Sequence, residues 1–310
     1  MTHVATLICN PAFPIVTQET IRRVMGSLTL PSEVRWLSPG VAADISFKPR
    51  AGFDAAVASE EIRALLGGAA VDVIVQRQEG RRKKLLLADM DSTMIGQECI
   101  DELAAETGKR AEISAITGRA MRGEIAFEPA LRERVALLKG LGRSVVSQVL
   151  AKRVTLTPGA CALVQTMRAN GAYTALISGG FSIFASAVAQ ILGFDEYQAN
   201  ELLFDEDERV SGVAEPVLGA GAKREALLRL CAEHSLSSSE TLAVGDGAND
   251  LSMLTAAGLG VAYHAKPKVA AAAQARVDYS DLTALLYAQG YERAEFAACP
   301  SPSAVRAGAS

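Results

Sequence analysis

Two aspartates, Asp89 and Asp91, are the residues of this sequence best placed to do chemistry. They directly follow the apolar run 85–88, so both carboxyl groups are expected at the end of a buried parallel strand. Ligands of open parallel sheets bind beyond the carboxyl ends of the strands. Ionised carboxylates are tolerated in such a place only beside a cation or a proton donor. The pair therefore predicts a reactive site that also holds positive charge.

Three further polar motifs follow expected strand ends or begin expected helices. These are Ser178-Gly179-Gly180, Lys223, and the run 245–250 with Asp246, Asn249 and Asp250. If Asp89 and Asp246 stood about 4 Å apart, their repulsion would be roughly 4 kcal/mol at an effective dielectric constant of 20. A cation would remove that repulsion, and an all-oxygen set of ligands is typical of Mg2+.

Carboxylates, a hydroxyl and a lysine around one cation suit the hydrolysis of a phosphomonoester. Because enzymes accelerate this reaction by up to ~10²¹-fold, a covalent step is attractive. Asp89 could attack phosphorus, while Asp91 could protonate the leaving alkoxide and then accept a proton from water. The Ser178 hydroxyl, the Gly179 amide at an expected helix start and the Lys223 ammonium could hold the phosphoryl oxygens.

From about Leu85 to Gly290, this ordered set of four motifs resembles the haloacid dehalogenase-like hydrolases, and among them the phosphoserine phosphatases. The resemblance implies Mg2+-dependent hydrolysis of O-phosphoserine to serine and phosphate, the last step of serine biosynthesis, through an aspartyl-phosphate. It implies that Asp89 is the nucleophile and Asp91 the acid and base. It also implies that Mg2+ binds the side chains of Asp89 and Asp246 and the backbone carbonyl of Asp91. Asp250 would lie behind these ligands, and Asn249 would position the phosphoryl group.

The same resemblance implies a pocket for the serine part of the substrate. Glu98 would bind its ammonium group and Arg134 its carboxylate, with two parallel hydrogen bonds from the guanidinium. Met121 and Phe127 would shield the pocket from one side.

Each assignment has a simpler alternative. Ser178-Gly179-Gly180 could be an ordinary strand-to-helix turn, and Lys223 could be a solvated lysine. Glu98 could be a favourable charge in the first turn of a helix, and Arg134 could form a surface ion pair. Met121 and Phe127 could be core residues.

The elements that would position these residues form an α/β protein with a doubly wound parallel sheet. Its core is expected at 81–96 and 154–290, where expected strands and helices alternate. Residues 97–153 carry helical patterns broken at glycines and are expected to form a cap over the strand ends. Residues 1–80 predict a small α+β domain of the order strand-helix-strand-helix-strand, which resembles ACT domains. Residues 291–310 are expected to be disordered.

Composition narrows the class of protein. The chain has 310 residues, of which 49% are hydrophobic, and its net charge is -4. No attraction to nucleic acid or to an anionic membrane surface is implied. Five cysteines without a close pair predict reduced thiols and a cytoplasmic protein, and three scattered histidines make a histidine-built zinc site improbable.

Several alternatives stay open at this point. Residues 1–80 could bind serine as a regulatory ligand, form a homodimer, or serve only for packing. The substrate could be another small phosphomonoester. A phospho-aspartate signalling receiver also places acidic residues, a hydroxyl and a lysine together, although it needs neither Asp91 nor a helical cap.

Overall fold

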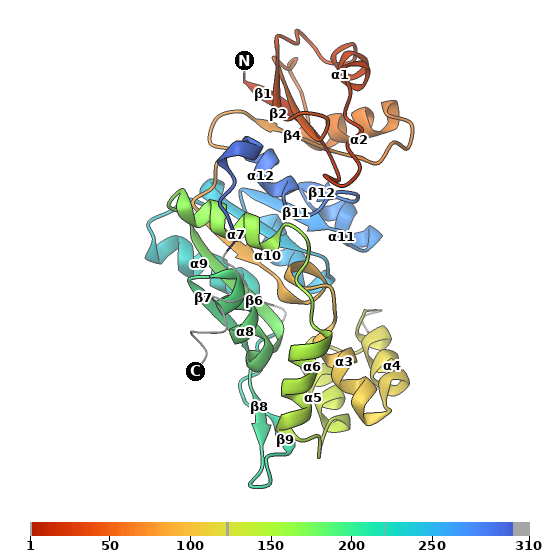
Figure 1. The fold of residues 1–310 in the computed structure, drawn as a ribbon, viewed down its shortest axis with the longest axis vertical. Coiled ribbons are helices and arrows are strands. Elements are labelled where there is room, and N and C mark those ends of the chain that lie inside the picture. The colour runs from red at the N-terminus through yellow and green to blue at the C-terminus, as the bar shows by residue number, and fades with distance from the viewer. Residues whose placement is uncertain (1, 122–123, 220, 300–310) are drawn as a thin grey trace.

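A computed structural model describes residues 2–121, 124–219 and 221–299 of the chain, apart from the side chain of Met121. Figure 1 shows an N-terminal α+β unit at one end, a central α/β unit, and a group of helices at the other end. The fold class predicted from the sequence is confirmed. The central sheet is parallel, and the N-terminal sheet is small and antiparallel.

The N-terminal unit contains one strand more than the sequence predicted. Its elements are β1 (His3–Cys9), α1 (Gln18–Met25), β2 (Glu33–Ser38), β3 (Ala42–Phe47), α2 (Ala55–Leu65) and β4 (Val71–Arg77). They form an antiparallel sheet of order β2-β3-β1-β4. The strand that escaped prediction belongs to the hairpin β2-β3. β2 lies at the sheet edge, where only Val34 and Trp36 of its first four residues pack on the core, so its apolar signal is weak.

The central sheet has six parallel strands in the order β12-β11-β10-β5-β6-β7. Their bounds are β5 (Leu85–Ala88), β6 (Tyr173–Phe181), β7 (Glu196–Asn200), β10 (Thr241–Gly245), β11 (Leu259–Tyr263) and β12 (Ala275–Val277). The short edge strand β12 was not predicted, because the sequence there reads as the end of an alanine-rich helix. β5 lies between β10 and β6, so Asp89 and Asp91, which follow β5 in the sequence, lie at the middle of the sheet.

Helices cover both faces of this sheet. They are α7 (Ala160–Ala169), α8 (Ser182–Leu192), α9 (Ala222–Glu233), α10 (Leu251–Ala256), α11 (Pro267–Ala272) and α12 (Ala284–Ala288). Leu86 of β5 packs in the cluster that contains α7, α8 and α12, whereas Leu87 packs in the cluster of α9, α10 and α11. This explains why β5 is apolar at every position rather than at alternate ones.

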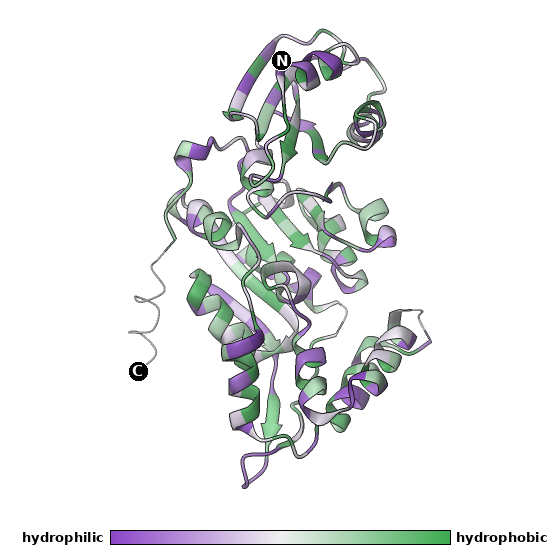
Figure 2. Cartoon of the chain, turned by 45° about the vertical axis from the view of Figure 1, so that its right-hand side comes forward, coloured by the Kyte–Doolittle hydropathy of each residue, from purple (hydrophilic) through white to green (hydrophobic). Residues whose placement is uncertain are grey.

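Figure 2 shows the same distribution as colour, with apolar residues along the strands of the central sheet and polar residues on the outer sides of many helices. No helix among the described residues is long and apolar enough to cross a membrane.

Four helices between β5 and α7 lie at the end of the molecule opposite the N-terminal unit (Figure 1). They are α3 (Cys99–Thr107), α4 (Arg110–Met121), α5 (Phe127–Leu137) and α6 (Arg143–Arg153). The two chain segments that join them to the sheet run side by side. Ile95 and Leu156 form an isolated antiparallel bridge, and the N–H of Gly96 donates to the carbonyl of Thr155.

A hairpin from the central unit supports these helices. This hairpin consists of β8 (Leu202–Phe204) and β9 (Val210–Val213). Gly140 donates its N–H to the Val210 carbonyl, and Val210 donates to the Leu141 carbonyl. The Arg143 guanidinium also lies 3.9 Å from the centre of the Phe204 ring.

Two expectations for the C-terminal segment are wrong. Residues 291–299 are ordered, with a helical turn at Arg293–Glu295 and a hydrogen bond from Ala297 N–H to the Thr166 hydroxyl. Cys299 forms a disulfide with Cys161 of α7, although the spacing of the cysteines predicted reduced thiols. Sequence separation hides this pair, because only the fold brings the last described residue back to α7. Residues 300–310 lie outside the described part of the chain.

Candidate active site

Three neighbouring strands bring the predicted polar motifs to one edge of the sheet. Asp89 follows β5, Asp246 follows β10, and Ser178 lies in the last part of β6. Asp89, Asp246 and Asp91 line a cavity of about 390 Å³ together with five other predicted residues, which are Glu98, Phe127, Arg134, Gly179 and Asn249. A small side pocket shares Phe127, Gly179 and Asn249 with this cavity and adds Ser178 and Lys223.

Lys223 is buried between two carboxylates. Its Nζ lies 2.6 Å from Asp89 Oδ1 and 2.5 Å from Asp250 Oδ1. Burial by itself lowers the pKa of Lys223, but the charges of Asp250 and Asp89 reverse this and raise it. The ammonium is therefore charged at neutral pH and is oriented by Asp250 toward Asp89. Asp250 in turn accepts the N–H of Gly247 at 2.9 Å, which fixes the loop that carries Asp246.

Asp89 is 5% exposed, and its Oδ1 accepts the N–H of Met90 at 2.7 Å. Burial raises the pKa of Asp89 well above its usual range, the Asp250 charge adds to this, and Lys223 opposes it. A carboxylate in this setting is poorly solvated, so an electron-poor phosphorus or a cation would stabilise it.

Asp91 has the environment of a proton donor at neutral pH. Burial, and next the charge of Glu98, raise its pKa to about 7. Its Oδ1 accepts the N–H of Cys99 at 3.0 Å at the start of α3, which orients the carboxyl group. The other oxygen faces β6. A Cβ at Gly180 would lie only 2.6 Å from Asp91 Oδ2, so glycine is required there.

Asp246 completes a group of carboxylates suited to a hard cation. Oxygens of Asp89, Asp246 and Asp250 lie within 4.8 Å of one another. Burial, and next the Asp250 charge, raise the pKa of Asp246 to about 7. One lysine cannot neutralise three carboxylates, and oxygen donors are those that Mg2+ prefers, so the residues present fit this ion. Asp89 and Asp246 line the cavity whereas Asp250 lies behind it, so Asp89 and Asp246 are the better placed side-chain ligands.

The structure corrects the surroundings of Ser178 and Gly179. β6 continues to Phe181 and α8 begins at Ser182, so the Gly179 amide does not belong to a helix start. Ser178 is 2% exposed and its hydroxyl accepts the N–H of Gly180 at 2.9 Å. Because the Ser178 oxygen is the acceptor in this bond, its hydroxyl hydrogen is not used there and can point toward another acceptor. The strand expected from the sequence ended before Ser178, because Ser178-Gly179-Gly180 reads as a turn.

Phe127 closes the site from the side of the helices. A Cβ on Gly179 would meet its ring Cζ at 2.8 Å, so the ring lies directly on the Gly179 backbone. Met121 was expected beside it; it ends α4, and its side chain lies outside the described part of the chain.

Glu98 and Arg134 line the part of the cavity nearer the helices. Glu98 accepts a hydrogen bond from the Ser92 hydroxyl at 2.7 Å. Arg134 donates to the Ala130 carbonyl at 3.2 Å and to the Thr117 hydroxyl at 3.4 Å. Its neighbour Arg132 instead points outward and pairs with Glu215 at 2.6 Å. Arg134 thus lines the cavity, and among the described residues it forms no surface ion pair of the kind that was its alternative explanation.

Two lysines of the cavity wall were missed from the sequence. Lys266 and Lys268 follow β11 on either side of Pro267 and line the cavity with Val269. The rule that drew attention to Asp246 applies to them too, because they follow the next strand of the same sheet. They were overlooked because the alanine-rich stretch around them reads as an ordinary surface helix.

Comparison with known proteins places the fold and the site in one family. Residues 83–258 match the family model of the haloacid dehalogenase-like hydrolases. The chain belongs to this family. A probable phosphoserine phosphatase of Schizosaccharomyces pombe is 44% identical to this hydrolase over 213 residues, which cover 68% of the chain and 71% of the relative. The resemblance inferred from the motifs is confirmed, and a hydrolase family argues against a signalling receiver.

Solved structures agree with this assignment. A HAD family hydrolase from Salmonella enterica serovar Typhi superposes with a TM-score of 0.81 at 27% identity, covering 94% of this hydrolase and 98% of that chain. A structure described as a phospho-aspartyl intermediate analogue of phosphoserine phosphatase gives 0.62 at 39% identity, covering 66% and 98%. Some curated phosphoserine phosphatases match over little more than half of their own length, 55% in one case.

Proposed function

We propose that this hydrolase is a Mg2+-dependent phosphoserine phosphatase that releases serine and inorganic phosphate through an aspartyl-phosphate on Asp89. One observation carries the proposal. A single cavity is lined by Asp89 and by both Glu98 and Arg134. Asp89 suits a phosphoryl group, and Glu98 and Arg134 suit the ammonium and carboxylate of an amino acid.

In the first half of the reaction, an Asp89 oxygen forms a bond to phosphorus while the bond from phosphorus to the serine oxygen breaks. Asp91 gives its proton to that oxygen, because a carboxyl group with a pKa of about 7 still holds a proton at neutral pH. Serine leaves as a neutral alcohol, and the phosphoryl group stays on Asp89.

In the second half, water attacks phosphorus and Asp91, now ionised, accepts a proton from it. The bond between phosphorus and the Asp89 oxygen breaks, which releases phosphate and restores both carboxyl groups. General acid and base catalysis of this kind typically contributes about 10²- to 10⁴-fold.

Groups around Asp89 stabilise the charge of the phosphoryl oxygens. The Lys223 ammonium and the Ser178 hydroxyl lie in the side pocket that adjoins the cavity, together with the Asn249 amide. The side chains of Asp89 and Asp246 and the backbone carbonyl of Asp91 would hold Mg2+. When bound, the ion would neutralise the carboxylates and the phosphoryl oxygens that meet there.

The helices at 97–153 act as a cap in this proposal. Phe127 lies on Gly179 and α5 carries Arg134, so closure of these helices both excludes water and completes the serine pocket. The core would comprise 81–96 and 154–290. Serine binding by residues 1–80 and dimerisation through them stay predictions, to be tested by serine inhibition and by the mass in solution.

A panel of phosphorylated metabolites, assayed for phosphate release with and without Mg2+, tests the function. Phosphoserine should be the best substrate and the activity should need the metal. A strong preference for a phosphosugar would instead support the alternative of another small phosphomonoester. The same assay with serine as product would place the reaction as the last step of serine synthesis.

A further inference from the structure

One buried carboxylate of the N-terminal unit holds three successive amides of the central unit. Asp72, on β4, is 0% exposed. Its Oδ1 accepts the N–H of Asp278 at 2.7 Å, and its Oδ2 accepts that of Ser280 at 2.8 Å. The N–H of Tyr279 lies 3.3 Å from both oxygens. Hydrogen bonds to an ionised acceptor are among the strong ones, so segment 278–280 is fixed by this side chain.

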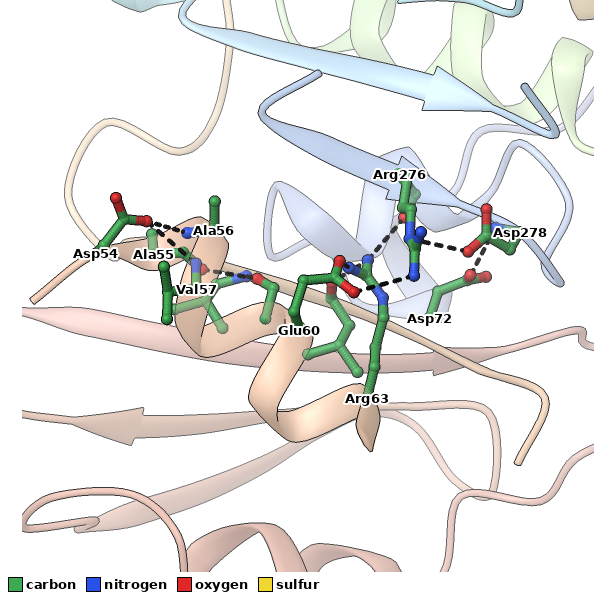
Figure 3. A network of polar contacts seen from close by, with 12 residues as sticks. Asp54, Ala55, Ala56, Val57, Glu60, Arg63, Asp72, Arg276 and Asp278 are labelled. Carbon is green, nitrogen blue, oxygen red and sulfur yellow. Dashed lines mark hydrogen bonds and ion pairs between the residues drawn. The ribbon is translucent and has the colours of Figure 1, made fainter. Parts of the chain in front are cut away.

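Beside Asp72, an ion pair between Glu60 and Arg276 joins the same two units at the surface. Figure 3 shows Glu60 of α2 paired with both Arg63 and Arg276, and Arg276 beside Asp278. Arg63 also donates to the Arg276 carbonyl at 3.2 Å. Glu60 is 58% exposed, so solvent screens its pairs, whereas Asp72 lies behind them and is screened from water.

Segment 278–280 in turn holds the loop that carries the missed lysines. The Ser280 carbonyl lies 2.8 Å from Nε2 of His264, and the backbone N–H of His264 donates to the Val277 carbonyl at 2.8 Å. His264 has a positive φ of 44°, an uncommon conformation for a residue with a side chain. Two residues later the chain reaches Lys266 at the cavity wall. Contacts on both sides of segment 278–280 thus join the N-terminal unit to the site.

We propose that Asp72 is a positioning residue for substrate binding, which acts through Ser280 and His264 to place the cavity wall at Lys266 and Lys268. The proposal rests on the proposed phosphatase function. Phosphoserine brings a phosphate dianion into a cavity lined by four carboxyl groups, Asp89, Asp91, Glu98 and Asp246. The Lys266 and Lys268 cations at the wall of this cavity offset that negative potential.

The first test is Asp72→Asn in the full chain. The amide keeps the size of the carboxylate but offers one acceptor oxygen and directs an NH2 group at backbone donors. The KM for phosphoserine should rise about five- to tenfold while kcat changes less than twofold. Asp89, Asp91 and Lys223 are untouched, and an interaction shared by ground and transition states affects KM alone.

Glu60→Gln is the matched control. It breaks the Glu60–Arg276 ion pair between the two units, and the Glu60–Arg63 pair within α2, but leaves all the hydrogen bonds of Asp72 in place. Its KM should equal that of the wild type. An equal rise in KM for both variants would show that general loosening of the contact is responsible, and would overturn the proposal.

A double-mutant cycle with Lys266→Met tests the route. If Asp72 acts through the lysine wall, Asp72→Asn should change KM little once Lys266 is gone, whereas independent effects would multiply and refute the route. Should Asp72→Asn fail to fold, His264→Phe decides, because it removes the bond to Ser280 and leaves Asp72 intact. An unchanged KM in His264→Phe overturns the proposal.

Wild-type activity is measured first, on the phosphomonoester panel with Mg2+. An inactive wild type would overturn the proposed function and this inference with it. An active wild type whose variants give multiplicative effects would overturn only the positioning role.

Discussion

The ammonium of Lys223 lies 2.6 Å from the carboxylate of Asp89, and both side chains are buried at the end of the central strand. Asp250 binds the same ammonium from the other side. Two carboxylates therefore share the one ammonium group of Lys223. Lys223 partly offsets the burial that raises the pKa of Asp89, and the negative charge that remains in this group is what a divalent ion would neutralise.

Replacing Lys223 by Met should destabilise the protein as well as inactivate it. Removing one partner of a buried pair leaves an uncompensated charge, which costs about 3 to 5 kcal/mol of unfolding free energy. Urea unfolding in EDTA measures this loss, and added Mg2+ should recover part of it. Lys84→Met is the control, because the Lys84 side chain is 64% exposed in its pair with Glu240 and such pairs contribute about 0 to 1 kcal/mol. Equal losses for both variants would contradict the role given to Lys223.

The metal-free protein should become less stable as pH rises from about 4 to about 7. Burial raises the pKa of Asp91 to about 7, whereas the unfolded chain titrates near its ordinary value of about 3.9. Within that window the folded state keeps a proton that the unfolded state has released, so the unfolding free energy falls with pH. Asp91→Asn should flatten the fall, and Asp246 would account for part of the remainder. Urea titrations in EDTA at several pH values measure this unfolding free energy. If it falls with pH equally in the wild type and in Asp91→Asn, Asp91 does not hold this proton.

Arg134→Ala should damage the hydrolysis of phosphoserine far more than that of an aryl phosphate without a carboxylate. Losing a buried guanidinium that binds a carboxylate costs about 3 kcal/mol, or roughly 100-fold in kcat/KM. Arg132→Ala, on the same helix but paired with Glu215 outside the cavity, should leave both rates near wild type. Equal losses on the two substrates would remove Arg134 from the serine pocket.

Gly179→Ala should hold the cap away from the sheet. The new Cβ would lie 2.8 Å from the Phe127 ring, so the ring must move and the cavity opens. We expect kcat/KM for phosphoserine to fall by about tenfold or more, a cost of the order known for overpacking. Adding Phe127→Leu should restore part of the loss. If Phe127→Leu lowered activity by the same factor in the Gly179→Ala variant as in the wild type, this would argue against contact between the two positions.

Much of the central unit could be predicted because local signals and tertiary structure agree there. β5 is apolar at every position since both of its faces are covered, and Asp89 and Asp91 follow at once. The rule that ligands bind beyond the strand ends then identified Asp246. The predictions that failed concerned features that depend on contacts between segments distant in the sequence. Ser178-Gly179-Gly180 extends β6 instead of starting a helix, because β7 pairs with Ile177 before this stretch and with Phe181 after it.

Other features had no local signal at all. Lys223 is shared by Asp89 and Asp250, which lie far from it in sequence, and only the fold reveals the sharing. Asp72 looks like a solvated aspartate within an alternating strand, yet it is buried against residues 278–280. The disulfide of Cys161 joins the helix α7 to a segment that composition alone marks as disordered.

The account depends most on Asp89 as the residue that attacks phosphorus. The direct test is Mg2+-dependent phosphate release from phosphoserine by Asp89→Asn, compared with wild type and with the circular dichroism of both proteins. We predict a correctly folded variant whose kcat is lower by at least about 10⁴-fold, as for enzymes that lose their nucleophile. Turnover within about tenfold of wild type would contradict the account.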